Sequence, residues 1–244
     1  MRTLGIIPAR YASTRFPGKP LAMIGNRSMI QRVYEQARQC CRIDALLVAT
    51  DDMRIFDHVH SFGGEAILTS PEHQSGTERC LEAALSLDGP IDAVINIQGD
   101  EPFIQPHQID ALAALVEDGA EIATLAIPIP YAISADPNKV KVVTDNHHKA
   151  LYFSRSPIPF YRDGIPDPTA RCLKHLGVYA YRFSTLQQIA RLEPATLEMA
   201  EKLEQLRWMQ NGYAIHVAIT DFESPAIDTP EDLQKVMESI DLLD

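Results

Sequence analysis

The sequence lacks any apolar run long enough to cross a membrane, and its four cysteines form no C-x-x-C or His-rich pattern. We therefore expect no membrane span, no zinc site and no disulfides. Cys40, Cys41, Cys80 and Cys172 are expected to be reduced and mostly buried. No signal peptide precedes the first strand pattern, which favours a cytoplasmic location.

The sequence also has few basic residues, 22 against 33 acidic ones, so the formal net charge is −11. A field of this sign repels polyphosphate backbones, which argues against a nucleic-acid partner. Any anionic ligand must then be held by a local cluster of Arg and Lys. Hydrophobic residues make up 45% of the 244 positions, enough for an ordinary core in one α/β domain with a smaller lobe.

Strand and helix patterns alternate along the first half of the chain. Short apolar runs predict strands at 4–7, 45–49, 65–68, 91–97 and 122–127. Helices are predicted to begin after Ser28, at Asp51 or Asp52, after Ser75 and at 106. This alternation predicts an α/β fold, a Rossmann-like and mainly parallel sheet with helices on both faces. Ligands of such sheets bind at the edge formed by the carboxyl ends of the strands.

The pattern changes after Pro128. Strands with short links are predicted at 139–144, 149–153 and 175–181, with prolines that include Pro166 and Pro168 between the last two. We interpret about 130–185 as a smaller antiparallel lobe inserted into a single domain spanning 1–244. Helices at 183–192 and 197–209, a strand at 213–219 and a final helix capped by Thr229 are predicted to complete the fold.

A cationic loop follows the first predicted strand. Arg10, Arg15 and Lys19 fall within ten residues, among small residues, prolines and Gly18. Three cations and free backbone N–H groups suit a nucleoside triphosphate and the charge that builds on a leaving pyrophosphate. The loop is neither a Walker P-loop nor a G-x-G-x-x-G motif. A solvated basic loop is the alternative reading of the same residues.

Two acidic residues are candidate ligands of Mg²⁺. Asp100 follows the predicted strand at 91–97, and Asp228 lies in a loop before the Thr229 cap. Mg²⁺ takes oxygen ligands and often combines one or two carboxylates with substrate phosphates. Taken alone, Asp100 also suits a turn, and Asp228 is better explained as a capping acid. Beside a triphosphate loop the pair indicates a metal site.

Several stretches then resemble the 3-deoxy-manno-octulosonate (Kdo) cytidylyltransferases, in that family's order from residue 4 to about 236. They are RYASTRFPGKP at 10–20, SGTER at 75–79, NIQGDEP at 96–102, ALYFSR at 150–155, HLGVY at 175–179, LEQLR at 203–207 and IDTPED at 227–232.

The resemblance implies a nucleotide-diphospho-sugar transferase fold whose inserted lobe serves sugar binding and dimer contacts. It implies CTP and Kdo as substrates, CMP-Kdo and pyrophosphate as products, dependence on Mg²⁺, a homodimer and a role in lipopolysaccharide biosynthesis. The corresponding reaction is in-line attack of the anomeric hydroxyl of the sugar on the α-phosphorus of CTP.

The resemblance also implies roles for individual residues. Those expected at CTP are Pro8, Ala9, Arg10, Ser13, Arg15, Lys19, Ser75, Gly76 and Gln98, with Arg10, Lys19, Asp100 and Asp228 as the catalytic set and Asp100 and Asp228 at the metal. Those expected at the acidic sugar are Gln98, Arg155, His175, Tyr179, Glu204 and Gln205.

Read from the residues alone, the sugar set is less distinctive. Arg155 can fork onto a carboxylate, whereas His175 suits a structural histidine and Tyr179 a core position. Glu204 and Gln205 suit the exposed face of the predicted helix at 197–209. The sequence differs from the family pattern at residues 223–226, shortly before Asp228, and in the short Pro-rich segment 163–171.

Two alternative functions stay open at this point. One is a cytidylyltransferase for another acidic sugar, such as 8-amino-Kdo or a sialic acid. The other is a nucleotide-binding module without turnover, which would have no need of two metal carboxylates.

Overall fold

The structure is a computed structural model that describes residues 1–165, 167 and 169–238, so Pro166 and Pro168 lie outside the described residues. The chain forms two compact units. The first comprises Met1–Ala113 and the segment from Ser224 onward, and the second comprises Ala114–Glu223. None of the helices in the described part of the chain combines the length and apolar character of a membrane span.

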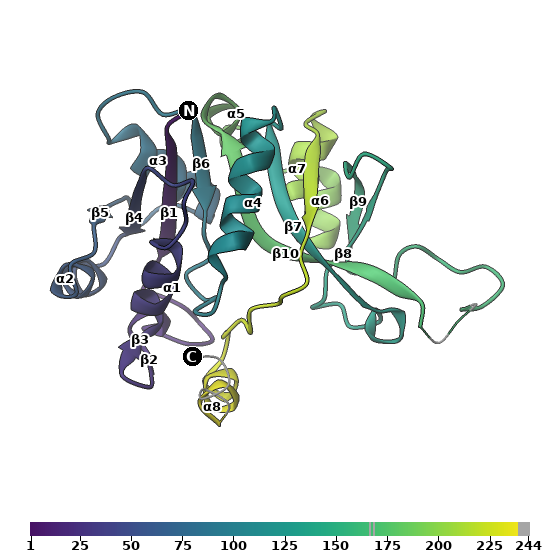
Figure 1. Cartoon of the computed structure of the whole chain (residues 1–244), viewed down its shortest axis with the longest axis horizontal. Helices are drawn as coiled ribbons and strands as arrows, with labels where there is room; N and C mark the ends of the chain where they lie inside the picture. The colour runs from purple at the N-terminus through teal and green to yellow at the C-terminus, as the bar shows by residue number, and fades with distance from the viewer. Residues whose placement is uncertain (166, 168, 239–244) are drawn as a thin grey trace. The chain divides into compact units, whose positions relative to one another are not determined.

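The first unit is built on four parallel strands (Figure 1). Their order in the sheet is β6 (Ala93–Asn96), β1 (Thr3–Ala9), β4 (Ala45–Thr50) and β5 (Ala66–Leu68). In β1 and β6 nearly every residue is buried, as expected for inner strands covered on both faces.

Three helices connect these strands: α1 (Met29–Ala37), α2 (Met53–Ser61) and α3 (Gly76–Leu85). The predicted caps are confirmed. The side chains of Ser28, Asp52 and Ser75 accept hydrogen bonds from backbone N–H groups in the first turns of α1, α2 and α3. These bonds satisfy donors that a helix leaves free at its N-terminus.

The strand order reverses at β1, which fixes where a ligand can bind. From β1 the chain steps outward to β4 and β5, then returns to the opposite side of β1 at β6. With right-handed crossovers, α1 and α2 cover one face and α3 covers the other. The carboxyl ends of β1 and β6 therefore flank a topological switch point, where ligands of open α/β sheets bind.

The first unit has three smaller parts besides the sheet. These are the 3₁₀ turn η1 (Lys19–Leu21), the hairpin β2 (Met23–Ile24) with β3 (Arg27–Ser28), and the helix α8 (Pro230–Glu238). A buried cluster of Ile24, Met29, Phe103, Ile227 and Val236 joins the hairpin to α1 and α8. The helix α4 (Pro106–Glu117) begins in this unit and ends in the second.

The second unit is a mixed sheet. Its strands are β7 (Ile122–Pro130), β8 (Lys141–Thr144), β9 (Ala150–Ser154), β10 (Arg171–Arg182) and β11 (Ile215–Ile219). β7 pairs parallel with β11 and antiparallel with β10, while β8 pairs antiparallel with β9 and β10. The turn η2 (Tyr131–Ile133) and the helices α5 (Phe183–Ile189), α6 (Thr196–Glu201) and α7 (Gln205–Gln210) complete it. The α/β class with a mixed sheet is confirmed; a lobe at 130–185 for sugar binding and dimer contacts stays a prediction.

One predicted element is wrong. The segment 197–209 is two helices, α6 and α7, rather than one. Lys202 ends α6 in the left-handed conformation, with φ of 54°. The backbone carbonyls of Glu201 and Lys202 then turn away from a continuing helix and accept hydrogen bonds from Arg155. A lysine carries no sequence signal for this conformation, which most often uses glycine.

Candidate active site

The cationic loop leaves β1 at Ala9 and closes on itself before η1. The N–H of Gly18 donates to the carbonyl of Tyr11 at 2.9 Å. Gly18 has φ of 71°, and a Cβ there would lie 3.1 Å from the Tyr11 ring. Glycine is therefore required at this turn by both conformation and space. The turn sets Lys19 at the start of η1.

The ammonium of Lys19 lies between the two predicted metal carboxylates. Its Nζ donates to Oδ2 of Asp100 at 2.8 Å and to Oδ1 of Asp228 at 3.2 Å. Nη1 of Arg15 lies 3.3 Å from the other oxygen of Asp228. The Lys19 side chain is 16% exposed, so its pairs are partly shielded from water. Segments more than 80 residues apart thus bring two carboxylates onto one cation.

Asp228 reaches this cluster because its segment is anchored on both sides. The N–H of Ile227 donates to the carbonyl of Asp100 at 3.0 Å, and the Ile227 side chain is fully buried. On the other side, the hydroxyl of Thr229 accepts the N–H of Asp232 at 3.2 Å. Thr229 therefore caps α8 as predicted, and the Asp228 carboxylate pairs with Lys19 and Arg15. The alternative reading of Asp228 as a capping acid is wrong.

A single cleft of the first unit gathers the residues predicted at CTP and at the metal. Its lining includes Pro8, Ala9, Arg10, Ser13, Arg15, Lys19, Ser75, Gly76, Gln98, Asp100 and Asp228. The structure brings these residues together, and their individual roles stay predictions. The lining also includes residues to which the sequence assigned no role, namely Pro20, His73, Gln74, Arg79 and Gly99.

Gly99 lets two loops of the cleft approach closely. A Cβ at Gly99 would lie 3.1 Å from the carbonyl oxygen of Pro8, a rigid backbone atom. Any larger residue would push the loop after β6 away from the loop after β1. The glycine therefore sets the spacing between the loops that bear Asp100 and Lys19.

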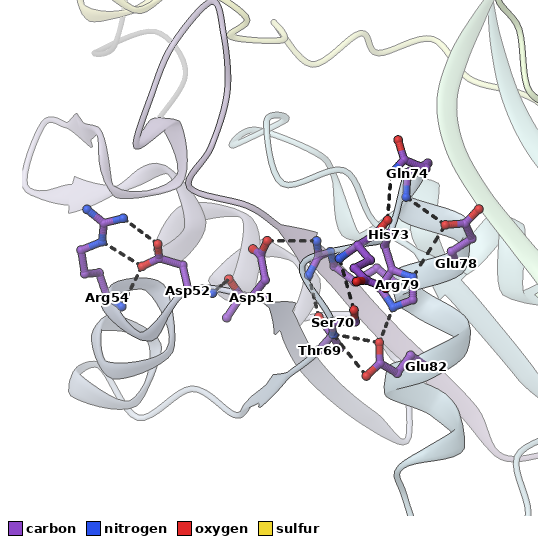
Figure 2. Close-up of polar contacts among 12 residues, drawn as sticks. Asp51, Asp52, Arg54, Thr69, Ser70, His73, Gln74, Glu78, Arg79 and Glu82 are labelled. Atoms are coloured by element: carbon purple, nitrogen blue, oxygen red, sulfur yellow. Dashed lines mark hydrogen bonds and ion pairs between the residues drawn. The ribbon is translucent and has the colours of Figure 1, made fainter.

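A network of polar contacts supports one wall of the cleft (Figure 2). Nε2 of His73 is hydrogen-bonded to the carboxylate of Glu82, whose oxygens also accept the N–H of Ser70 at 3.0 and 3.2 Å. Burial raises the pKa of Glu82, but the Ser70 and His73 bonds outweigh it and the pKa is lowered. Glu82 therefore stays ionised and holds the 70–76 loop against α3.

Arg79 is the most buried cation of this wall. Its side chain is only 5% exposed, with Nη1 2.6 Å from the hydroxyl of Thr69 and Nη2 3.5 Å from Asp51 (Figure 2). An arginine on a helix is exposed by default, so no role could be assigned to Arg79 from the sequence. Its position in the SGTER stretch was the only available signal.

Tyr11 of the cationic loop is covered by Arg54 of α2. The guanidinium carbon of Arg54 lies 3.3 Å from the centre of the Tyr11 ring. Asp52 orients the guanidinium through bonds of 2.9 and 2.6 Å to Nε and Nη2. This cation–π contact fastens the cationic loop to the start of α2.

Five of the six residues predicted at the sugar belong to the second unit, namely Arg155, His175, Tyr179, Glu204 and Gln205. The rings of His175 and Tyr179 lie 5.4 Å apart, and Tyr179 packs on Trp208 of α7 at 5.1 Å. Burial raises the pKa of Tyr179 well above its usual value, and the Glu204 carboxylate raises it further. The Tyr179 hydroxyl therefore stays protonated. Tyr179 is buried, as the sequence predicted.

Gln205 differs from its prediction. It lies at the start of α7, 5% exposed, rather than on an exposed helix face. The break at Lys202 changes the helical phase and turns Gln205 inward. Its Nε2 has no hydrogen-bond partner among the described residues. A buried amide without a partner is costly, which makes it a candidate ligand-binding group.

Arg155 is held by backbone carbonyls of the second unit. Nε donates to Glu201 at 2.7 Å, Nη1 to Pro137 at 2.9 Å and Nη2 to Lys202 at 3.3 Å. A guanidinium has five N–H donors, so each Nη keeps one N–H for a carboxylate. The predicted fork onto a sugar acid is therefore compatible with this clamp, and it stays a prediction.

Asp100 and Asp228 fit a divalent cation. Both present a carboxylate oxygen to the same positive nitrogen, so their oxygens already converge on one charge. No cluster of three or more His, Cys, Asp or Glu forms within residues 1–165, 167 and 169–238. Two carboxylates suit a hard divalent cation, which takes oxygen ligands and can complete its shell with phosphate and water. The described cysteines are free thiols, three of them buried, as predicted.

Comparison with known proteins identifies the family. The sequence profile of the cytidylyltransferase family matches residues 4–219. The 3-deoxy-manno-octulosonate cytidylyltransferase of Bacteroides thetaiotaomicron is 51% identical over 98% of each chain. That of Syntrophobacter fumaroxidans is 52% identical over 97% of this chain and 96% of its own.

Solved structures agree with these relatives. A CMP:2-keto-3-deoxy-manno-octonic acid synthetase in complex with CTP has a TM-score of 0.94 and 43% identity over 99% of each chain. A cytidylyltransferase from Leptospira borgpetersenii, at a TM-score of 0.66 and 16% identity, shares the fold. The chain belongs to the cytidylyltransferase family and, within it, to the 3-deoxy-manno-octulosonate cytidylyltransferases.

Proposed function

We propose that the protein transfers CMP from CTP to Kdo, giving CMP-Kdo and pyrophosphate. The observation that carries the proposal is the convergence of Lys19, Asp100 and Asp228 in a cleft at the switch point of the sheet. The near full-length likeness to Kdo cytidylyltransferases supports the choice of base and sugar.

In the proposed reaction the anomeric oxygen of Kdo forms a bond to the α-phosphorus of CTP. The bond from that phosphorus to the bridging oxygen breaks, pyrophosphate leaves, and the anomeric proton passes to solvent. Arg10, Arg15 and Lys19 would bind the phosphates and stabilise the charge on the departing group. Positioning and charge neutralisation would therefore supply most of the rate.

Asp100 and Asp228 would hold Mg²⁺ at the triphosphate. When bound, the ion would neutralise phosphate charge and favour ionisation of the attacking hydroxyl. The ion pairs of Lys19 with both carboxylates hold Asp100 and Asp228 together at one edge of the cleft.

In the second unit, Arg155 would bind the sugar carboxylate, while His175, Tyr179, Glu204 and Gln205 would bind its hydroxyl groups. The unpartnered Nε2 of Gln205 supports this assignment, because a sugar oxygen would satisfy it. Gln98 would lie along cytidine and sugar. A homodimer, a cytoplasmic location and a part in lipopolysaccharide synthesis stay predictions that rest on the resemblance.

The choice of sugar is tested with CTP, Mg²⁺ and three acceptors in separate reactions: Kdo, 8-amino-Kdo and a sialic acid. We expect a CMP-sugar, detected by mass spectrometry, with Kdo at the highest kcat/KM. Preference for another acid would correct the sugar and leave the transfer in place. Absence of any CMP-sugar, with CTP binding retained, would favour a module that binds nucleotide without turnover.

A further inference from the structure

The cluster at the edge of the cleft is electrically balanced. The carboxylates of Asp100 and Asp228 carry two negative charges, and the side chains that contact them, Lys19 and Arg15, carry two positive charges. Lys19 contributes most, because it bonds to both carboxylates and is only 16% exposed. A divalent cation that approaches this cluster thus meets little net attraction.

Competition for the carboxylates follows from this geometry. A metal ion held by both Asp100 and Asp228 would lie beside the ammonium of Lys19, which bonds to Oδ2 of Asp100 and Oδ1 of Asp228. Both oxygens of Asp228 are already paired, one with Lys19 and the other with Arg15, so the ion must displace a cation there. Mg²⁺ also gives up hydration water reluctantly. Displacement of the mostly buried Lys19 ammonium adds a further cost, because charge pairs are stronger where water is partly excluded.

A nucleoside triphosphate changes the balance. Arg10, Arg15 and Lys19 line the cleft together, and a triphosphate brings several negative charges that can draw these cations away from the carboxylates. Asp100 and Asp228 then become available to the metal, and the phosphate oxygens supply further ligands.

We propose that Lys19, assisted by Arg15, is an internal counter-ion that keeps divalent metal off Asp100 and Asp228 until a triphosphate binds. This inference rests on the proposed function, since it uses the same metal and nucleotide assignments. Metal and CTP therefore bind cooperatively, and by linkage each raises the affinity of the other by the same factor. Premature metal binding to the empty cleft is suppressed.

The test measures metal affinity rather than turnover. Mn²⁺ is titrated into the protein without nucleotide, and free Mn²⁺ is followed by electron paramagnetic resonance. The variants are Lys19→Met, the double variant Lys19→Met/Asp100→Asn, and Lys139→Met. Lys139 pairs with Asp136 at 2.7 Å and lies outside the cleft lining, so it controls for loss of one charge. Circular dichroism verifies that each variant is folded.

We expect Lys19→Met to bind Mn²⁺ about tenfold more tightly than the wild type, within the usual range of coupling between sites. Lys139→Met should match the wild type, and the double variant should lose the gain, since the gain requires Asp100. Equal affinity of the wild type and Lys19→Met would overturn the inference. So would an equal gain in Lys139→Met.

A second titration separates this inference from the proposed function. CTP binding is measured by calorimetry with and without Mn²⁺, in the absence of sugar. We expect Mn²⁺ to strengthen CTP binding in the wild type and to do so less in Lys19→Met. If Mn²⁺ strengthens CTP binding equally in both, the counter-ion role is wrong while the metal site stands. If Mn²⁺ affects CTP binding in neither and binds neither protein, the metal assignment itself is wrong.

Discussion

Nε2 of His175 lies 3.0 Å from the hydroxyl oxygen of Thr124, and that hydroxyl lies 2.9 Å from the carbonyl of Val178. Where Thr124 donates its single proton to the Val178 carbonyl, the imidazole carries its proton on Nε2 and donates to Thr124. The surroundings of the ring disfavour a charge. Desolvation, with a smaller contribution from the neighbouring charge of Lys174, lowers the pKa of His175 to about 3. The ring is thus neutral at physiological pH.

This neutral histidine predicts a pH dependence of stability. The pKa of His175 is lower in the folded state than in the unfolded state. Between these two pKa values the unfolded chain binds a proton at His175 and the folded chain does not. The stability linked to His175 is complete above about pH 6.5 and is lost as pH falls toward about 3. Urea unfolding of the wild type and His175→Gln at pH 7, 5.5 and 4.5 measures this. The variant should lose less stability between pH 7 and 4.5, and parallel losses would contradict the assignment.

Thr229 and Asp228 are adjacent residues with separate roles. Thr229→Ala should lower the free energy of unfolding by about 1 kcal/mol, because it removes the cap of α8. Asp228→Asn should change stability by less than about 0.5 kcal/mol, because the Asp228 side chain is 43% exposed and an amide oxygen can still accept from Lys19, yet it should abolish most turnover. Urea denaturation and steady-state kinetics on both variants check this. A stability loss in Asp228→Asn as large as that in Thr229→Ala would restore the capping role to Asp228.

Lys19→Ala should lower kcat/KM, because it removes about 2–4 kcal/mol of transition-state stabilisation. This loss is comparable with removal of one preorganised donor. Asp100→Asn should remove the dependence of turnover on Mg²⁺. Initial rates over a range of Mg²⁺ concentrations measure both effects, with Lys139→Ala as the matched loss of a lysine. An unchanged rate in Lys19→Ala would exclude this residue from the site, and normal Mg²⁺-dependent turnover in Asp100→Asn would exclude the metal ligand.

Substitution of Lys141 is expected to alter the position of Arg155 while the Arg155 side chain itself is unchanged. Lys141 is 0% exposed, and its Nζ donates to the carbonyl of Arg155 at 2.5 Å and to that of Asp136 at 3.1 Å. Lys141→Met should therefore raise the KM for Kdo more than the KM for CTP, because it loosens the backbone that carries Arg155. Its neighbour Lys139 pairs with Asp136 through a partly exposed ion pair and, in the described part of the chain, makes no bond to Arg155, so Lys139→Met should change neither KM. Equal rises in both KM values for Lys141→Met would indicate a general loss of folding instead.

The sequence predicted those parts of the site that lie where parallel strands end. Lys19 and Asp100 follow apolar runs, and the carboxyl ends of parallel strands share one edge of a sheet. The α/β class and most helix starts were predicted for a similar reason, because caps such as Ser28 and Ser75 are local signals. Apolar runs and helix caps are formed by residues that are adjacent in the sequence, so they can be recognised without the structure.

Other parts depend on contacts between distant segments. In the sequence Arg79 and His73 are ordinary polar residues. Their roles depend on folding, which places Arg79 against Thr69 and Asp51 and places His73 against Glu82. The left-handed Lys202, which divides α6 from α7, has no local signal, because Arg155 takes the carbonyls at the end of α6. The convergence of Asp228 with Asp100 similarly requires the packing of Ile227 into the core.

The central claim is tested most directly by pyrophosphate release in the presence of Mg²⁺, with CTP, UTP, ATP or GTP, each with and without Kdo. We predict release with CTP and Kdo together and no release when either is missing or another nucleotide replaces CTP. Release with no combination, from protein that is folded, would contradict the assignment of this chain as a cytidylyltransferase acting on Kdo.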